Sequence, residues 1–280
     1  HETLRTNFST INGEPVAIIN EARVWAMQEK DLSALDTVSQ DDALQSLIRE
    51  QLDTGFNLQS DPLLRGILVK LTAADGKPEH AFIGAMHHII SDGWSLNVMT
   101  AELMELYQAI VEQREARLPE LAIQYVDVAA WQRKWLSGEV LDQHIQYWRD
   151  RLDNDGQVLQ LQTDYPRPAV MTSHGAVVRA RISPQVVGQI TDLAQEEGAT
   201  LFMVLVAAYQ LLLHNYTGQE RINIGTPIAG RDSVEMEQLV GFFINTVVLS
   251  TELQPSQSVR ELLRQVREVT LGAYAHQALP

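Results

Sequence analysis

Two adjacent histidines, a carboxylate and a glycine stand close together in the chain, at His87-His88 and Asp92-Gly93. A neutral imidazole has a pKa near 6.5, so at neutral pH it can accept a proton and return it. Acyl transfer to an amine needs a group that accepts and returns protons, because the nitrogen must lose protons as the new bond forms. We therefore expect His88 to act on a substrate amine, with His87 as a structural neighbour whose ring points into the protein.

Two roles stay open for His88. An α-amino group titrates at about pH 8, so a sizeable fraction of it is already neutral near pH 7.5. Holding the attacking nitrogen and removing its second proton can therefore matter more than the first deprotonation.

A metal site is the alternative use of the two histidines. Adjacent residues of an extended segment point to opposite sides, so the pair does not easily bind one ion. The chain has no cysteine, and no His-x-x-x-His or Glu-x-x-His pattern lies nearby. We expect no metal here.

Asp92 can be interpreted in two ways. It could orient the imidazole, as the aspartate of a serine hydrolase does, or it could anchor its own loop by pairing with a buried arginine. We favour the anchor, because a buried carboxylate without a cation is unfavourable, and Arg5 is the candidate cation. Gly93 either takes a positive φ or leaves room where a ligand passes the backbone.

The motif lies between a predicted strand and a predicted helix. Apolar runs at 64–71 and 80–86 predict two strands joined by a turn that contains Asp75-Gly76. Ser95 suits the N-cap of a helix that continues to about residue 113. Rigid elements on both sides would hold the motif in place.

The same alternation of strands and helices continues to the end of the chain, which favours an α/β fold of two lobes that meet at a cleft. Residues 153–168 lose periodicity, and we place the lobe boundary there. The elements expected after the motif helix are helices at 125–136 and 140–152, a strand at 176–182, a helix capped by Ser183, a helix at 200–215, strands at 221–226 and 240–249, and a helix capped by Ser258.

Composition excludes several classes of protein. The formal charge of -15, without a basic stripe, argues against nucleic-acid binding. The longest apolar run, 201–213, contains Gln210 and is shorter than the roughly 20 residues that cross a bilayer, so we predict a buried helix and no membrane span. With no cysteine and no visible targeting segment, a cytoplasmic location is the simplest expectation.

Several segments together resemble the condensation domain of nonribosomal peptide synthetases. The stretch 86–95 is similar to the family's His-His-x-x-x-Asp-Gly core with its usual flanks, and 1–8 to its Arg-His-Glu-x-Leu-Arg-Thr-x-Phe segment without the first Arg. Further similar blocks lie at 125–131, 240–246 and 276–280. The family's first and last motifs are absent, which predicts a domain truncated at both ends.

The resemblance implies a fold and a reaction. The fold would be two lobes like chloramphenicol acetyltransferase, arranged as a V with the active site between them: residues 1–162 form the N-terminal lobe and 163–280 the C-terminal lobe. The reaction would be amide formation between a donor acyl or peptidyl thioester and the α-amine of an acceptor aminoacyl thioester. Both substrates would be carried on the phosphopantetheine of partner carrier domains, and the domain itself would bind no cofactor.

The resemblance also assigns roles to residues. His88 would be catalytic, as a base or as a hydrogen-bonding stabiliser of the transition state, and Asp92 would pair with Arg5 to shape the loop. Gly93 would line the acceptor channel, with Trp94, Ser95 and Asn245 at the channel or cleft. The implied partners are an upstream donor carrier, a downstream acceptor carrier and an adjacent adenylation domain.

Two alternatives stay open. One is a related acyltransferase or epimerisation domain with the same double histidine, although an epimerisation domain usually has Trp after the Ser of this motif, whereas here Trp94 precedes Ser95. The other is a catalytically silent module that docks a carrier or recruits another enzyme. An intact His88 weakens the second alternative.

Overall fold

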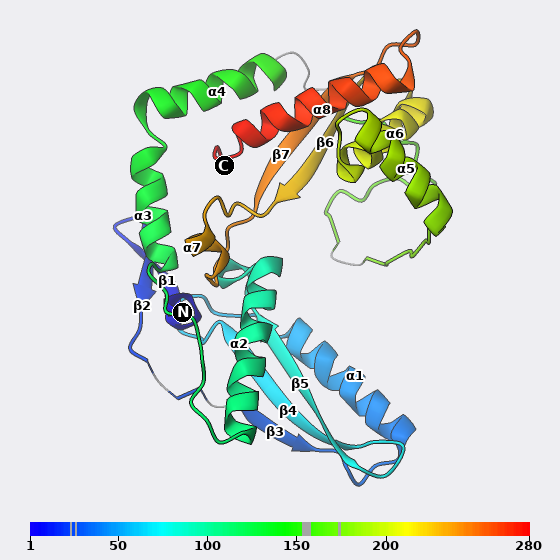
Figure 1. The fold of residues 1–280 in the computed structure, drawn as a ribbon. Helices are drawn as coiled ribbons and strands as arrows, with labels where there is room; N and C mark the ends of the chain where they lie inside the picture. The colour runs from blue at the N-terminus through cyan, green and yellow to red at the C-terminus, as the bar shows by residue number, and fades with distance from the viewer. Residues whose placement is uncertain (23, 26, 153–157, 173–174) are drawn as a thin grey trace. The chain divides into compact units, whose positions relative to one another are not determined.

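The computed structural model describes residues 1–22, 24–25, 27–152, 158–172 and 175–280 (Figure 1). Its internal contacts divide the chain into two compact units, His1–Lys134 with Arg231–Ile244, and Trp135–Gly230 with Asn245–Pro280. This division differs from the predicted boundary between residues 162 and 163. Sequence periodicity did not reveal that a short segment between two strands of the second unit packs with the first.

The first unit contains a three-stranded sheet in the order β3, β4, β5. β4 (Leu64–Thr72) and β5 (Pro78–Met86) form the predicted antiparallel hairpin, and β3 (Gln28–Asp31) runs parallel to β4. Helix α1 (Thr37–Asp53) packs on β4 and β5 (Figure 1). The hairpin fixes the register of the strand that leads into the double histidine, because Met86 pairs with Leu64 at its end.

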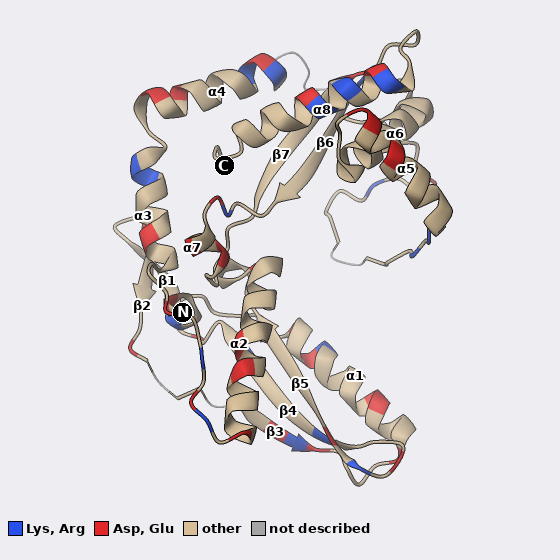
Figure 2. Cartoon of the chain, in the orientation of Figure 1, with Lys and Arg blue, Asp and Glu red and all other residues tan. Residues whose placement is uncertain are grey.

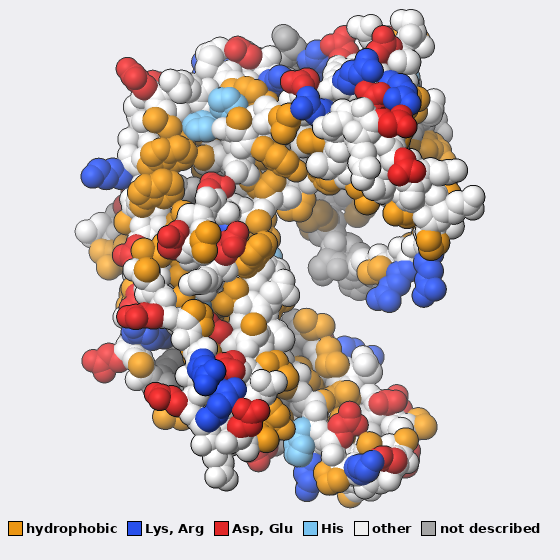
Figure 3. Space-filling view, in the orientation of Figure 1, with side chains coloured by type: hydrophobic (Ala, Val, Ile, Leu, Met, Phe, Trp, Pro, Cys, Tyr) orange, Lys and Arg blue, Asp and Glu red, His pale blue; other side chains and the backbone are white. Residues whose placement is uncertain are grey.

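The remaining elements of the first unit come from its N-terminus, from the motif and the helices that follow it, and from the segment 231–244. They are η1 (Glu2–Arg5), the hairpin β1 (Thr6–Ile11) and β2 (Glu14–Ile19), η2 (His88–Ile90), α2 (Gly93–Val111), α3 (Tyr125–Trp135) and α7 (Val234–Glu237). The hydrophobic side of α2 is only partly covered, since Leu103 is 53% and Ile110 77% exposed. Figure 3 shows hydrophobic side chains at the surface of this unit.

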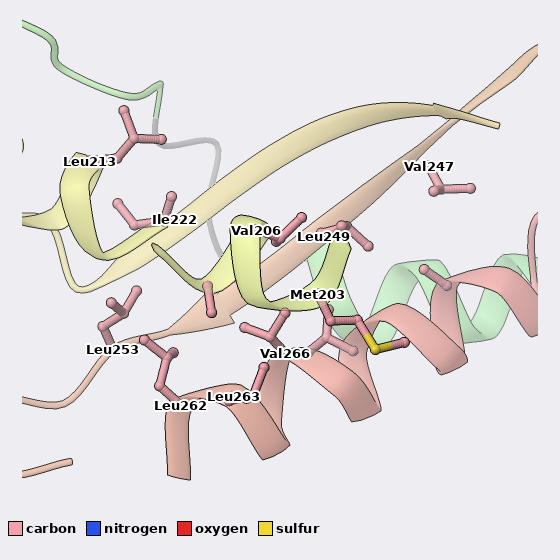
Figure 4. Packing of buried hydrophobic residues seen from close by; sticks show 13 residues of the cluster. Met203, Val206, Leu213, Ile222, Val247, Leu249, Leu253, Leu262, Leu263 and Val266 are labelled. Atoms are coloured by element: carbon pink, nitrogen blue, oxygen red, sulfur yellow. The ribbon is translucent and has the colours of Figure 1, made fainter. Parts of the chain in front are cut away.

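The second unit packs helices on a two-stranded antiparallel sheet of β6 (Arg221–Ile228) and β7 (Asn245–Glu252). Its helices are α4 (Gly138–Leu152), α5 (Pro184–Glu196), α6 (Leu201–Thr217) and α8 (Val259–Ala275). Leu262, Leu263 and Val266 of α8 meet residues of α6 and β7 in one hydrophobic core (Figure 4). Helix α8 begins at the predicted cap, because the Ser258 side chain accepts a hydrogen bond from the backbone N–H of Glu261.

Helix α6 is half-buried, whereas the sequence predicted a buried helix. Met203, Val206 and Leu213 face the core, but Leu212 and Tyr209 on the other side are each 50% exposed. Among the described residues, no single helix is both long and apolar enough to cross a membrane. Only α5 and α6 together, bent by 104°, pass that test of length and composition.

Two strand predictions were wrong in whole or in part. Residues 176–182 form no strand, and Val177 and Val178 are 83% and 95% exposed. Their β-branched side chains favour a strand, but β6 and β7 pair only with each other in the described part of this unit. The strand predicted at 240–249 begins at Asn245, because residues 240–244 belong to the segment that packs with the first unit.

Acidic and basic side chains are mixed along α8, whereas α2 and α5 carry acidic side chains alone (Figure 2). On α8, for example, Arg260 and Arg264 bind Glu196 and Glu197 at the end of α5.

The core of the second unit yields a stability prediction. Leu263 is 1% exposed, whereas Val259 on the same helix is 59% exposed. Leu263→Ala removes core packing and leaves a cavity, so we expect the free energy of unfolding to fall by about 2–5 kcal/mol. Val259→Ala is the control, with an expected loss below about 0.5 kcal/mol. Urea denaturation measures both, and equal losses for the two variants would contradict the core described here.

Candidate active site

The motif occupies the connection between β5 and α2. β5 ends at Met86, and the backbone N–H of His87 still donates to Leu63 O at 3.0 Å. The chain then makes a single 3-10 turn, His88–Ile90, before α2 begins at Gly93. A sheet and a 19-residue helix therefore hold the motif from both sides.

His88 has an exposed side chain with one ring nitrogen in a hydrogen bond. Its Nδ1 lies 2.5 Å from the backbone oxygen of Ser91. A carbonyl oxygen only accepts, so Nδ1 carries the proton and Nε2 keeps its lone pair. The neutral ring is thus held in the tautomer whose free nitrogen can accept a proton from a substrate.

His87 is held differently from its neighbour. Its Nδ1 accepts a hydrogen bond from the backbone N–H of Ile89 at 3.0 Å, and its half-buried ring packs edge-on against Phe56 with centroids 5.9 Å apart. These contacts shape the turn, as expected for a structural residue. No group of three or more potential metal ligands occurs in the part of the chain that the structure describes.

Asp92 caps α2 and is almost fully buried, at 3% exposed. Its carboxylate accepts hydrogen bonds from the backbone N–H of Ser95 at 2.8 Å, the Ser95 hydroxyl at 2.7 Å and the backbone N–H of Phe243 at 3.1 Å. The prediction of Ser95 as the N-cap was wrong: the helix begins earlier, at Gly93, and Asp92 is the preferred cap residue whose side chain accepts from the N–H three positions on.

The cation beside Asp92 is Arg231, at 3.0 Å and 3.2 Å from the two carboxylate oxygens. Both side chains are 1% exposed. The prediction that Arg5 is this cation was wrong: Arg5 is partly exposed and binds Glu2 and the backbone oxygen of Asn20. The Arg5 guanidinium, in the N-terminal 3-10 turn, binds residues near it in the sequence. Arg231 belongs to the segment 231–244, which packs with the first unit.

Sequence reasoning missed Arg231 because it lies 139 residues from its partner. A usable signal was present, since a buried carboxylate demands a cation and Arg231 lies in the short stretch between the predicted strands at 221–226 and 240–249. Arg231 also donates to Met236 O at 2.5 Å and to Leu239 O at 2.8 Å, and its guanidinium lies 4.0 Å from the centre of the Phe243 ring. The Arg231 side chain therefore stabilises the conformation of its own segment and also binds that segment to the motif.

Ser95 and Trp94, both expected at the channel or cleft, make hydrogen bonds to the segment 231–244, which we call the returning segment. The Ser95 hydroxyl accepts from the backbone N–H of Gly241 at 3.1 Å, and Ser95 is completely buried, so it is not available to a substrate. Trp94 donates its indole N–H to Glu237 O at 2.8 Å, while 41% of the residue stays exposed.

The two glycines of the site differ in the space around them. Gly93 has no positive φ, and a Cβ built there would meet no atom within 4 Å, so it borders open space. A Cβ on Gly241 would clash with the Tyr125 ring. Gly241 therefore allows Tyr125 to pack against the segment, where its hydroxyl donates to Phe242 O at 2.7 Å.

Asn245 belongs to the second unit, and its side chain is engaged there. The amide donates to the backbone oxygens of Gln277 and Leu279, both at 2.7 Å. The ring of His276 stacks on Tyr147 at 4.0 Å in the same region. Asn245 thus anchors the segment that follows α8, which accounts for this side chain without a substrate contact.

Burial and hydrogen bonding act in opposite directions on Asp92. Burial alone raises the pKa of this carboxyl, but the hydrogen bonds from Ser95 and Phe243 and the charge of Arg231 outweigh it, so the pKa lies below its ordinary value. Asp92 is therefore ionised at neutral pH. Because its oxygens bind these groups, and Nδ1 of His88 binds Ser91 O, Asp92 does not orient the imidazole.

Comparison with known proteins identifies the family of the chain. The sequence model of the condensation domain family matches residues 1–280. One of the linear gramicidin synthase proteins of Brevibacillus parabrevis is 46% identical over 280 residues, which are all of this chain and 5% of that protein. Two other proteins of the same synthase are each 44% identical over the same length, and the chain spans 4% and 5% of them.

Solved structures share the fold. The SgcC5 protein from Streptomyces globisporus is 30% identical with a TM-score of 0.78, over 99% of this chain and 61% of that one. The X-domain from teicoplanin biosynthesis, solved in complex with OxyB, is 25% identical with a TM-score of 0.87, over 100% of this chain and 60% of that one.

The chain belongs to the condensation domain family. The predicted α/β class and chloramphenicol acetyltransferase-like fold are confirmed, and so is the recognition of the family from its motifs. Condensation domains of nonribosomal peptide synthetases form peptide bonds, so the chain is an acyltransferase by class.

The ion pair at the site predicts strong coupling between two distant residues. Asp92→Asn and Arg231→Met each leave one buried partner uncompensated, and we expect each to lower the free energy of unfolding by about 3–5 kcal/mol. The double variant should lose clearly less than the sum, which urea denaturation of all four proteins measures. Arg5→Ala removes a partly exposed pair and is the control, with an expected loss of about 1 kcal/mol or less. Additive losses would contradict the pairing.

The lowered pKa of Asp92 predicts a pH dependence. A carboxyl whose pKa is lower in the folded than in the unfolded chain contributes full stability above the unfolded value, near 3.9, and loses it as the pH falls through the folded value. The difference in unfolding free energy between the wild type and Asp92→Asn should therefore be constant from about pH 5.5 to 7.5 and shrink below about pH 4. Urea denaturation across this range measures it, and a difference that grows in acid would refute the direction of the shift.

Proposed function

We propose that this chain joins a donor acyl or peptidyl thioester to the α-amine of an acceptor aminoacyl thioester, with His88 as the catalytic residue. The observation that carries the proposal is an exposed imidazole whose Nδ1–H is fixed by Ser91 O at 2.5 Å and whose Nε2 has no hydrogen-bond partner among the described residues. The curated relatives named above are synthases of linear gramicidin, so a peptide product is the natural expectation for this chain too.

The chemistry follows from the tautomer. The acceptor nitrogen attacks the thioester carbon, the C–N bond forms and the C–S bond breaks, and the donor thiol leaves with a proton that came from the amine. Nε2 of His88 is the group that holds the nitrogen by a hydrogen bond or takes its proton and passes it on. Both roles need the same geometry, a fixed lone pair directed at the nitrogen.

The substrates and partners follow from the family. Both thioesters would be carried on phosphopantetheine arms of an upstream and a downstream carrier domain, with an adenylation domain as a neighbour. The chain itself would bind no cofactor, because the phosphopantetheine arms are part of the substrates. We also propose the predicted cytoplasmic setting for this chain.

A docking role is the second candidate. The observation in its favour is the likeness to the X-domain, which was solved in complex with a second protein, OxyB. His88, with its free Nε2, argues for chemistry instead, because a surface that only docks a partner has no need of a fixed tautomer.

The decisive variant is His88→Ala. Loss of the base or hydrogen-bonding group should lower amide formation at least about 100-fold, measured by mass spectrometry of the acceptor thioester after incubation of the full-length protein with loaded donor and acceptor carriers. His80→Ala is the control, because His80 is exposed on the same strand β5 and lies away from the motif. Circular dichroism checks that both variants fold.

Two outcomes would overturn the proposal. Wild-type rates for His88→Ala would remove His88 from the reaction. A wild-type protein that binds loaded carriers but makes no amide would favour the docking module.

A further inference from the structure

Phe242 packs directly against the His88 imidazole. The ring centroids are 5.1 Å apart and the ring planes are at 90°, an edge-to-face contact. Phe242 is 40% exposed, so this contact is not simply the consequence of a place in the core.

The backbone of Phe242 is held on both sides. Its own carbonyl accepts from the Tyr125 hydroxyl at 2.7 Å, the N–H of Gly241 donates to Ser95 at 3.1 Å, and the N–H of Phe243 donates to Asp92 at 3.1 Å. These bonds leave the main chain at Phe242 little freedom, so the position of its ring is set by the same buried cluster that caps α2.

The two phenylalanines have different neighbours. The Phe243 ring lies 5.0 Å from the Tyr125 ring and 4.0 Å from the Arg231 guanidinium, on the side of the buried ion pair. The Phe242 ring instead meets His88. In the returning segment, Phe243 thus packs beside the buried ion pair, whereas Phe242 contacts His88.

His88 needs a second constraint. The hydrogen bond from Nδ1 to Ser91 O fixes one edge of the imidazole but leaves the plane of an exposed ring free to tilt about that edge. Phe242 lies against the ring at a right angle and opposes this tilt. Small errors in the direction of a catalytic lone pair can cost large factors in rate.

We propose that Phe242 is a positioning residue that holds the His88 imidazole so that Nε2 faces the acceptor amine. This rests on the proposed role of His88. The ring acts through His88 and takes no part in bond making itself, so its loss should reduce the rate of the chemical step more than the affinity for the acceptor.

The test compares Phe242→Ala with Phe242→Tyr in the full-length protein, with carriers loaded as above. For Phe242→Ala we expect kcat to fall about fivefold to tenfold, the size of one aromatic pair, with the acceptor KM changed less than about twofold. Phe242→Tyr keeps the ring and should restore kcat. Phe82→Ala is the control, because Phe82 is 48% exposed on β5 of the same unit and should leave kcat unchanged.

A second readout does not depend on activity. Diethyl pyrocarbonate modifies the free nitrogen of an imidazole, and peptide mass spectrometry follows His88 alone among the eight histidines. Phe242→Ala should expose the His88 ring and speed its modification, while Phe242→Tyr and Phe82→Ala should match the wild type.

The outcomes separate the two proposals. Slower turnover with unchanged KM, faster modification of His88 and rescue by Phe242→Tyr support positioning. An unchanged kcat, a loss carried entirely by KM, or a fall in kcat with unchanged modification of His88 each overturn it. An active His88→Ala would remove the proposed function, and the modification rates would still report whether Phe242 restrains the ring.

Discussion

The buried pair of Asp92 and Arg231 is the interaction on which the site depends. Both side chains are 1% exposed, and they hold the start of α2 to the segment 231–244, because Arg231 binds Asp92 and Asp92 accepts from the N–H of Phe243. A buried ion pair of this kind adds little net stability over a hydrophobic pair, but removing one partner is strongly unfavourable. We infer that its contribution is specificity, because it joins two segments that are far apart in the sequence.

That arrangement explains how a short loop can present a reactive imidazole. Asp92 caps α2 and holds the N–H of Phe243, which leaves Phe242 beside His88. The histidine itself is exposed, and in the described part of the chain its hydrogen bond is a local one, to Ser91. The scaffold thus provides rigidity through buried polar groups and leaves Nε2 free, which is the combination that acyl transfer to an amine requires.

Local features of the chain were predictable from sequence, and distant pairings were not. The β4–β5 hairpin and the cap at Ser258 follow from turn and capping residues that act within a few positions. Arg5 was the wrong partner for Asp92 because nothing in a single sequence shows that the chain returns to the first unit at Arg231. The strand at 176–182 failed for a related reason, since a β-branched run forms a strand only where a partner strand is available.

Amide hydrogen exchange of Arg231→Met tests the central claim most directly. The N–H groups of Gly241 and Phe243 donate to Ser95 and Asp92, and the account predicts that both exchange faster in the variant, while the N–H of Val69 in the β4–β5 hairpin keeps its wild-type protection. Unchanged protection at Gly241 and Phe243 would contradict it, because the segment would then be held against the motif without the ion pair.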